Sequence, residues 1–308
     1  MPRLNYALPV DVVRRFNPQI TQSNLENWSS NPESALIGHE DVDKISARIE
    51  GVESKWDRSA RPMREVRVGS QDAPVYKSAK GRGFPIHVYL DNRNIQPFDA
   101  SQGDLIERRT GRNSWTDITA EEGSSWVADY RQGQLTIYEL PGRGHMPVLR
   151  QHRDRFIRLS YRIGAGGDRG LAGQTTLSSQ LSQGATTTVG VADASRLPQT
   201  GGVMLVDGAE YVEVASVDHS NDEITVASRG VRATTDDQRA SGSTVHYCPL
   251  DVREAVAAKA TQELVRYDDW TDVVVDNGRA PQPERKLDDW EDEWTSTVAQ
   301  YSDNYGYQ

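Results

Sequence analysis

The chain has 308 residues, 36% of them hydrophobic, and a formal net charge of −10, which allows one large domain or two to three small ones with their own cores. No apolar run reaches even half of the ~18 residues that a membrane span needs, and the N-terminus is charged where a secretory signal is apolar, so we expect neither feature. The single cysteine, Cys248, excludes an intrachain disulfide framework and indicates synthesis in a reducing cytoplasm.

Two helices are predicted near the N-terminus. The first lies in LPVDVVRRFNPQI and ends at Asn17-Pro18, because proline interrupts helices. The second covers HEDVDKISARIEGVESKWDR, where apolar residues at steps of three and four form one stripe on a charged rod. The members of this stripe are Val42, Ile45, Ile49, Val52 and Trp56. Such a stripe more often packs in a core than forms an active surface, so we expect 1–62 to be the helical start of the core.

From residue 63 to residue 173 we expect a β-rich region, since the apolar period changes to two. Short strands are predicted in PIHVYL, SWTDIT, SWVADY and QLTIYEL. The last run, RFIRLSYRIGAGG, alternates regularly and predicts a half-buried antiparallel strand that glycines end. Its apolar face consists of Ile157, Leu159, Tyr161 and Ile163, and its opposite face of Arg158, Ser160 and Arg162.

Segment 174–248 is predicted to be a separate small β-domain. Its clearest element is GGVMLVDGAEYVEV, where Asp207-Gly208 lies between two alternating apolar runs, a strong signal for a β-hairpin. Further strands in NDEITVASRGV and GSTVHYC bring the total to five or six, which is typical of a small barrel or sandwich. Because different structure resumes on both sides, we expect an insertion at a loop tip.

The helical pattern returns after the β-domain. A core helix is predicted over 249–270, a linker with two prolines over 271–283, and a last helix and tail with an acidic outer face over 284–308. The narrow apolar face of the core helix consists of Val252, Val256, Ala260 and Leu264. The apolar stripe of the last helix consists of Leu287, Trp290, Trp294, Val298 and Tyr301. This stripe has to be buried, either on a partner, as large aromatic anchors often are, or on the chain's own domain, and both alternatives are open.

The sequence offers little for catalysis. It contains no G-x-S-x-G elbow, no P-loop and no H-E-x-x-H motif. GAGGDRG, residues 164–170, resembles a dinucleotide loop but is not followed by a helix that would bind the phosphate. His246 and Cys248 have no partner pair of metal ligands nearby, and Glu121-Glu122 is typical of a solvated turn. We therefore expect no enzymatic activity, no cofactor and no metal site.

The charges are unevenly distributed along the chain. Residues 1–173 contain twenty-two acidic and twenty-five basic residues, 174–248 nine and four, and 249–308 fourteen and six. A mildly basic body with an acidic tail indicates contacts between copies or with an oppositely charged partner.

Two basic clusters are candidates for such contacts. The glycine-rich loop KSAKGRG carries Lys77, Lys80 and Arg82, and RQHRDRFIR adds four arginines. Either cluster fits a non-specific contact with DNA phosphates, and pairing with acidic residues of a neighbouring copy is the alternative.

The choice of charged residues points to concentrated salt. Aspartate outnumbers glutamate 27 to 18, and arginine outnumbers lysine 29 to 6. An aspartate-rich surface with little lysine is typical of a protein that stays hydrated where the Debye length falls to roughly 3 Å, at about 1 M salt. We interpret this as halophilic, with an ordinary acidic protein from a high-GC genome as the alternative.

Two parts of the chain resemble proteins of tailed viruses. GATTTVGVADASRLP, GGVMLVDGAEYVEV, ITVASRGVRATT and ASGSTV together resemble a small β-module of virion structural proteins. VDVVRRFNP, RLSYRIGAGG and CPLDVREAVAAKATQELV resemble the head-tail connector, or adaptor, family. The sequence departs from that family by about a hundred β-rich residues before RLSYRIG, by the inserted module and by its acidic, tryptophan-bearing tail.

The resemblance implies an α+β fold, a helical connector core with a β-rich middle region and an inserted small all-β barrel or sandwich. It implies a structural protein in the virion neck of a tailed haloarchaeal virus, made in the host cytoplasm. The implied partners are further copies in a ring of roughly twelve, the portal, and tail or neck proteins, with at most non-specific contact with packaged DNA and no membrane. On this interpretation the last helix's stripe docks on the portal.

Two other functions are open. The first is another tail, baseplate or fibre component of a tailed virus, since the β-module is shared among virion proteins. The second belongs to a different class, a carbohydrate-binding or carbohydrate-active surface protein that stacks sugars on Trp115 and Trp126.

Overall fold

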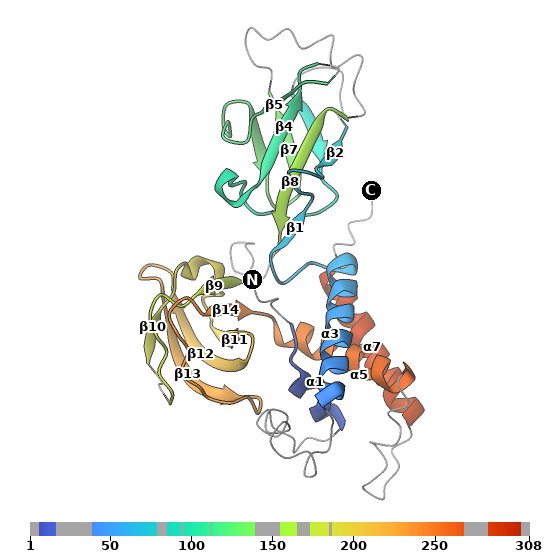
Figure 1. Ribbon diagram of the computed structural model, residues 1–308, viewed down its shortest axis with the longest axis vertical. Helices are drawn as coiled ribbons and strands as arrows, with labels where there is room; N and C mark the ends of the chain where they lie inside the picture. The colour runs from blue at the N-terminus through green and yellow to red at the C-terminus, as the bar shows by residue number, and fades with distance from the viewer. Residues whose placement is uncertain are drawn as a thin grey trace, which may run out of the picture. The chain divides into compact units, whose positions relative to one another are not determined.

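The structure, a computed structural model, describes residues 6–16, 39–78, 85–93, 95–111, 113–138, 155–164, 173–184, 187–267 and 283–302. This part of the chain is mixed α and β, with four α-helices and several antiparallel sheets (Figure 1). It divides into two compact units. The described residues up to Arg64 and from Gly173 onward form the first unit, and those from Glu65 to Gly164 form the second. The second unit therefore interrupts the sequence of the first.

The helices of the first unit form one bundle that joins both ends of the sequence. They are α1 (Pro9–Phe16), α3 (His39–Ser59), α5 (Leu250–Tyr267) and α7 (Pro283–Tyr301). The helix α5 contacts each of the other three (Figure 1). All four predicted helices are confirmed, and α1 ends directly before Asn17-Pro18, as proline requires.

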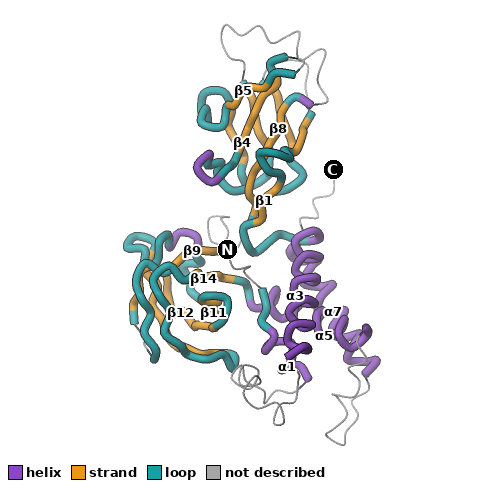
Figure 2. Tube along the Cα trace, in the orientation of Figure 1, coloured by secondary structure: helices purple, strands orange, loops and turns teal. Residues whose placement is uncertain are grey.

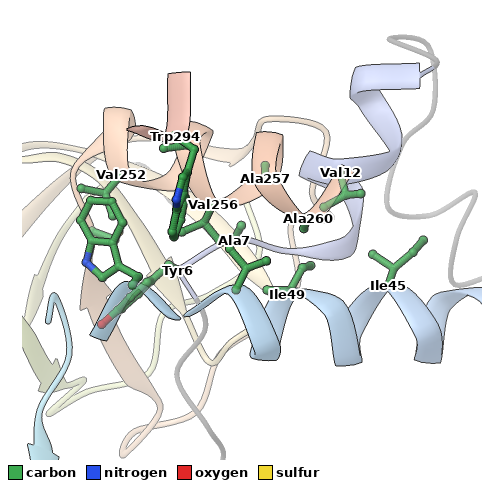
Figure 3. Close-up of a cluster of buried hydrophobic side chains, with 14 of the residues drawn as sticks. Tyr6, Ala7, Val12, Ile45, Ile49, Val252, Val256, Ala257, Ala260 and Trp294 are labelled. Carbon is green, nitrogen blue, oxygen red and sulfur yellow. The ribbon is translucent and has the colours of Figure 1, made fainter. Parts of the chain in front are cut away.

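An apolar core holds the bundle together. Ile45, Ile49, Val52 and Trp56 of the α3 stripe are fully buried, and so is the predicted face of α5 with its alanines. Figure 3 shows this packing, with side chains of α3 directed toward those of α5 and Trp294 of α7 in the same cluster. The small alanine side chains bring α3 and α5 close together, and burial of the larger chains contributes roughly 1.5–3 kcal/mol for each.

A six-stranded antiparallel sheet completes the first unit, in the order β10-β13-β12-β11-β14-β9 (Figure 1). Figure 2 shows its strands in orange, apart from the purple helices. Its strands are β9 (Gln174–Thr176), β10 (Thr188–Gly190), β11 (Gly202–Val206), β12 (Glu210–Asp218), β13 (Glu223–Val231) and β14 (Thr244–Tyr247). A bridge between Leu177 and Val191 joins the chain just beyond the two edge strands, so the sheet curls toward closure. The expected small β-domain is thus one curled sheet and not two packed sheets. Its insertion at a loop tip stays a prediction.

The predicted hairpin is confirmed as β11 and β12. Asp207 and Gly208 have φ of 56° and 67°, and the Ala209 amide donates to the Val206 carbonyl oxygen at 3.1 Å. Two central residues at positive φ define a type I′ turn, whose twist matches that of paired strands. Local sequence therefore determines this element.

The second unit contains two further antiparallel sheets. In one, the order is β1-β8-β4-β5 and β2 also pairs with β8; in the other, the order is β3-β7-β6. The strands are β1 (Val66–Val68), β2 (Val75–Lys77), β3 (Ile86–Tyr89), β4 (Leu105–Arg109), β5 (Trp115–Asp117), β6 (Trp126–Asp129), β7 (Gln134–Ile137) and β8 (Ile157–Ile163). A common apolar core lies between them, with residues of β3, β4, β6, β7 and β8.

The prediction that β8 is half-buried is wrong at two positions. The four apolar residues face the core as expected, but Ser160 and Arg162 on the opposite face are also buried. The Arg162 guanidinium donates to the Asp104 carboxylate at 2.8–3.1 Å, and Asp104 is itself buried. A paired carboxylate allows a guanidinium to be buried, and alternation along one strand does not reveal such a partner.

The hairpin offers a matched pair of glycine substitutions. A Cβ at Gly208 would meet no atom within 4 Å, whereas a Cβ at Gly201 would lie 2.2 Å from the Val214 carbonyl oxygen. We expect Gly208→Ala to lower the free energy of unfolding by about 1 kcal/mol, the cost of positive φ, and Gly201→Ala to lower it substantially more. Urea unfolding of both variants checks this. Equal losses would contradict the steric role of Gly201.

Candidate interaction surfaces

Three residues of the predicted docking stripe on α7 lie in the chain's own bundle core. Trp294 is 9% exposed and meets Trp56 edge-on, with ring centroids 5.7 Å apart. Tyr301 also contacts Trp56, at 5.7 Å, and its hydroxyl donates to Asp251. Val298 packs against the same cluster. The alternative that the stripe packs on its own domain therefore holds for the buried Trp294, and Val298 and Tyr301 are partly buried against the same cluster.

The other two predicted docking residues are half-buried near the start of α7. Leu287 lies two turns and Trp290 one turn before the buried Trp294. The Leu287 carbonyl oxygen accepts a 3.0 Å hydrogen bond from the Gln262 side-chain amide. Docking on a partner stays a prediction for this end of the helix. Ion pairs between Lys259 and Glu291, and between Arg15 and Glu293, also hold α7 to the bundle.

The basic loop is only partly described. Lys77 is the last residue of β2, its side chain is 13% exposed, and its ammonium group pairs with Asp91. Lys80 and Arg82 lie outside the described residues. Because Lys77 already has a carboxylate partner, a DNA contact of this loop stays a prediction for the other two residues.

The outer face of the second unit's larger sheet brings together aromatic and arginine side chains. Strand register places Tyr76 opposite Arg158, and Trp115 opposite Arg109. The Tyr76 and Trp115 rings meet edge-on, 5.8 Å between centroids. The guanidinium groups of Arg158 and Arg109 lie 5.0 and 5.7 Å from the Trp115 ring, and that of Arg155 lies 5.1 Å from Tyr76. We call these five residues the arginine–aromatic face.

Sequence reasoning did not find this face as a unit. It singled out Trp115 and the arginines of RQHRDRFIR separately and did not mention Tyr76. Period-two alternation indicates which side of its own strand each residue occupies. It does not indicate that β2 and β4 pair with β8 and that β5 pairs with β4, which is what brings the rings together.

Trp126 is no sugar platform. Its side chain is fully buried, and its indole Nε1 donates to the Ile118 carbonyl oxygen at 2.7 Å. Phe98 packs edge-on against it, 5.4 Å between centroids. The carbohydrate alternative therefore keeps only Trp115, where two guanidinium groups already lie over the ring.

A buried polar cluster ties the N-terminal segment to α3. Glu53 accepts hydrogen bonds from the Tyr6 amide at 2.6 Å and from the Arg64 guanidinium at 2.8 Å. Arg64 also donates a hydrogen bond to the Asp57 carboxylate, which accepts a second one from the Tyr6 hydroxyl. Burial raises the pKa of Glu53 to about 7, against the opposing effects of the Arg64 charge and the Tyr6 amide. This carboxyl therefore titrates near neutral pH.

The residues considered for chemistry have structural partners. His246 Nε2 lies 3.0 Å from the Met63 carbonyl oxygen, and burial raises the pKa of the Cys248 thiol to about 12. Glu121 accepts from the Ser125 hydroxyl and Glu122 from the Tyr130 hydroxyl. Within the described ranges, no group of three or more His, Cys, Asp or Glu side chains is arranged to hold a metal ion.

Comparison with protein-family models, curated proteins and solved structures finds no match to this chain. None of the helices described combines the length and the apolar character that crossing a membrane requires.

Trp294 and Trp290 provide a matched test of the α7 stripe. Truncation of a fully packed tryptophan costs about 3–5 kcal/mol, so Trp294→Ala is expected to lower the free energy of unfolding by that amount. Trp290→Ala, at a half-buried position, is expected to cost less. Denaturant unfolding of both variants measures the difference. An undiminished stability of Trp294→Ala would contradict its place in the core.

Glu53 predicts a pH dependence of stability. Its pKa in the fold, about 7, lies above the ordinary 4.5, so its contribution to stability is fully present below about pH 4.5 and is lost as the pH rises through 7. The difference corresponds to on the order of 3 kcal/mol. We expect Glu53→Gln to remove this part of the pH dependence between pH 4.5 and 7.5, measured by urea unfolding. Parallel stability curves for the two proteins would show that Glu53 does not titrate in this range.

Proposed function

We propose that the chain is a structural virion protein, a head-tail connector or adaptor that forms a ring on the portal and joins capsid to tail. The observation that carries the proposal is the contact between α1 and α5. Two of the motifs that resemble the connector family, VDVVRRFNP and CPLDVREAVAAKATQELV, lie on these helices, more than two hundred residues apart in sequence. Their packing in one bundle is what a shared helical core would produce.

The physical properties of the chain suit such a role. Ring assembly uses a heterologous interface, in which one surface meets a different surface of the next copy, and permanent interfaces usually bury more than about 2,000 Å². Screening in concentrated salt weakens long-range attraction, so these interfaces would depend on apolar anchors and short contacts. In this role the protein would act in the virion neck by binding and by continuing the DNA channel, with no catalytic step.

A second candidate is another tail, baseplate or fibre component of a tailed virus. It is supported by the curled sheet β9–β14, since the segment that forms it resembles a module shared among virion proteins. A gene position between portal and tail genes would favour the connector over this candidate. The carbohydrate-binding alternative is weakened by the burial of Trp126.

The proposal is tested by the mass of the protein in solution. The full chain, purified in about 2 M KCl to keep an acidic protein hydrated, is examined by light scattering alone and with the portal. We expect a ring, or a stable complex that forms only with the portal. A strict monomer that is indifferent to the portal would contradict the connector function.

A further inference from the structure

The arginine–aromatic face has the composition of a protein-binding surface. Tyrosine, tryptophan and arginine are the residues enriched at interface hot spots, and here they lie in contact on one side of a sheet. Tyr76 is 43% exposed and Arg155 is also exposed. This face therefore offers apolar area and donors at the same place.

The aromatic rings also prepare the arginines for binding. A guanidinium that lies over a ring keeps its planar set of N–H donors, which fits a carboxylate in bidentate geometry. Arg158 already donates to Glu107 through Nε and through Nη2, the latter at 2.8 Å. Among the described residues, Arg155 has no carboxylate within ion-pair distance, and its guanidinium lies over the Tyr76 ring.

The low net charge of the face favours a protein over nucleic acid. Glu107 neutralises Arg158, and Asp117 lies opposite Glu107 on the same side of the sheet. Phosphate backbones are bound mainly by an excess of positive charge, and that interaction weakens steeply with salt. Short contacts at partly desolvated groups are screened less.

A matching acidic surface lies on α7. Asp288, Asp289 and Asp292 are exposed and lie within little more than one turn of the helix. Among the residues whose side chains the structure describes, no Lys or Arg forms an ion pair with these three. Glu291 and Glu293, by contrast, are paired with Lys259 and Arg15.

The two units as a whole also differ in the balance of their charges, as these two surfaces do. From residue 65 to residue 165 the sequence has fifteen basic and twelve acidic residues, whereas the remainder has twenty basic and thirty-three acidic. Copies that meet through unlike units therefore attract each other, and copies that meet through like units gain less.

We propose that the arginine–aromatic face binds a second copy of this chain through the exposed aspartates of α7, with Arg155 as the donor and Tyr76 as the apolar anchor. The contact is heterologous, since the two copies contribute different surfaces, and such contacts form a ring when the rotation between copies closes. The inference deepens the proposed ring and rests on it.

Charge reversal tests the pairing. We expect Arg155→Glu and Asp289→Arg each to weaken self-association of the full chain at least about tenfold, and the two together in one chain to restore part of it. Arg131→Glu, at an exposed position between β6 and β7, is the matched control and should have no effect. Light scattering over a concentration series measures association. Loss in the single variants without recovery in the double variant would overturn the pairing.

Cross-linking tests whether the contact lies between copies. Arg155→Cys and Asp289→Cys are made in separate chains, and a short bismaleimide is added to each alone and to the mixture. Cys248 is 2% exposed and does not compete. We expect covalent dimers in the mixture alone. A ring that forms without this cross-link, and without any effect of Arg155→Glu, would overturn the surface and leave the connector function standing.

The remaining outcomes separate the two proposals. Cross-linked copies that do not bind the portal would support the surface and contradict the connector function. A monomer at all concentrations would overturn the surface. A chain that does not self-associate but binds a thirty-base-pair DNA duplex would also overturn the surface, provided that Arg155→Glu abolishes this binding. The face would then bind nucleic acid and not a second copy.

Discussion

The helical bundle depends on the burial of Trp56. This side chain, near the end of α3, contacts Trp294 and Tyr301 of α7, and its indole Nε1 donates to the Arg61 carbonyl oxygen at 2.9 Å. The Arg61 amide in turn donates to the Tyr301 carbonyl oxygen at 3.1 Å. One aromatic contact with its hydrogen bonds thus holds the end of α7 against α3. The end of the stripe with Trp294 and Tyr301 is therefore used inside the protein.

A network of ion pairs connects the β-sheet of the first unit to the same bundle. Arg232, which follows β13, pairs with Asp11 of α1 and Glu254 of α5. Arg15 of α1 pairs with Glu254 and with Glu293 of α7. The buried Tyr211 hydroxyl donates to Asp11. Because these groups are partly or fully buried, salt screens them less than surface pairs. Partly buried ion pairs of this kind suit the halophilic protein that we infer from the composition.

Among the described residues, the exposed large aromatic side chains are Tyr76, Tyr89 and Tyr138, and all three belong to the second unit. The outer acids of α7 and the arginine–aromatic face differ in charge and lie on different units. Neither includes a group of metal ligands in the part of the chain that the structure describes. Binding between unlike surfaces of repeated copies is the chemistry that this arrangement supports best.

Local patterns in the sequence determined the elements whose partners are close by. The apolar period of α3, the proline after α1 and the Asp207-Gly208 turn were read correctly, because periodicity and turn geometry depend on neighbouring residues alone. Only the tertiary structure decided what those elements bury. Trp294 and Trp126 face the chain's own core, Arg162 is buried beside Asp104, and Tyr76 meets Trp115 across β8 and β4. Each of these outcomes depends on a residue that is distant in sequence. Whether a side chain is buried is decided by the partner that packs against it, so the pattern along one strand or helix cannot predict it.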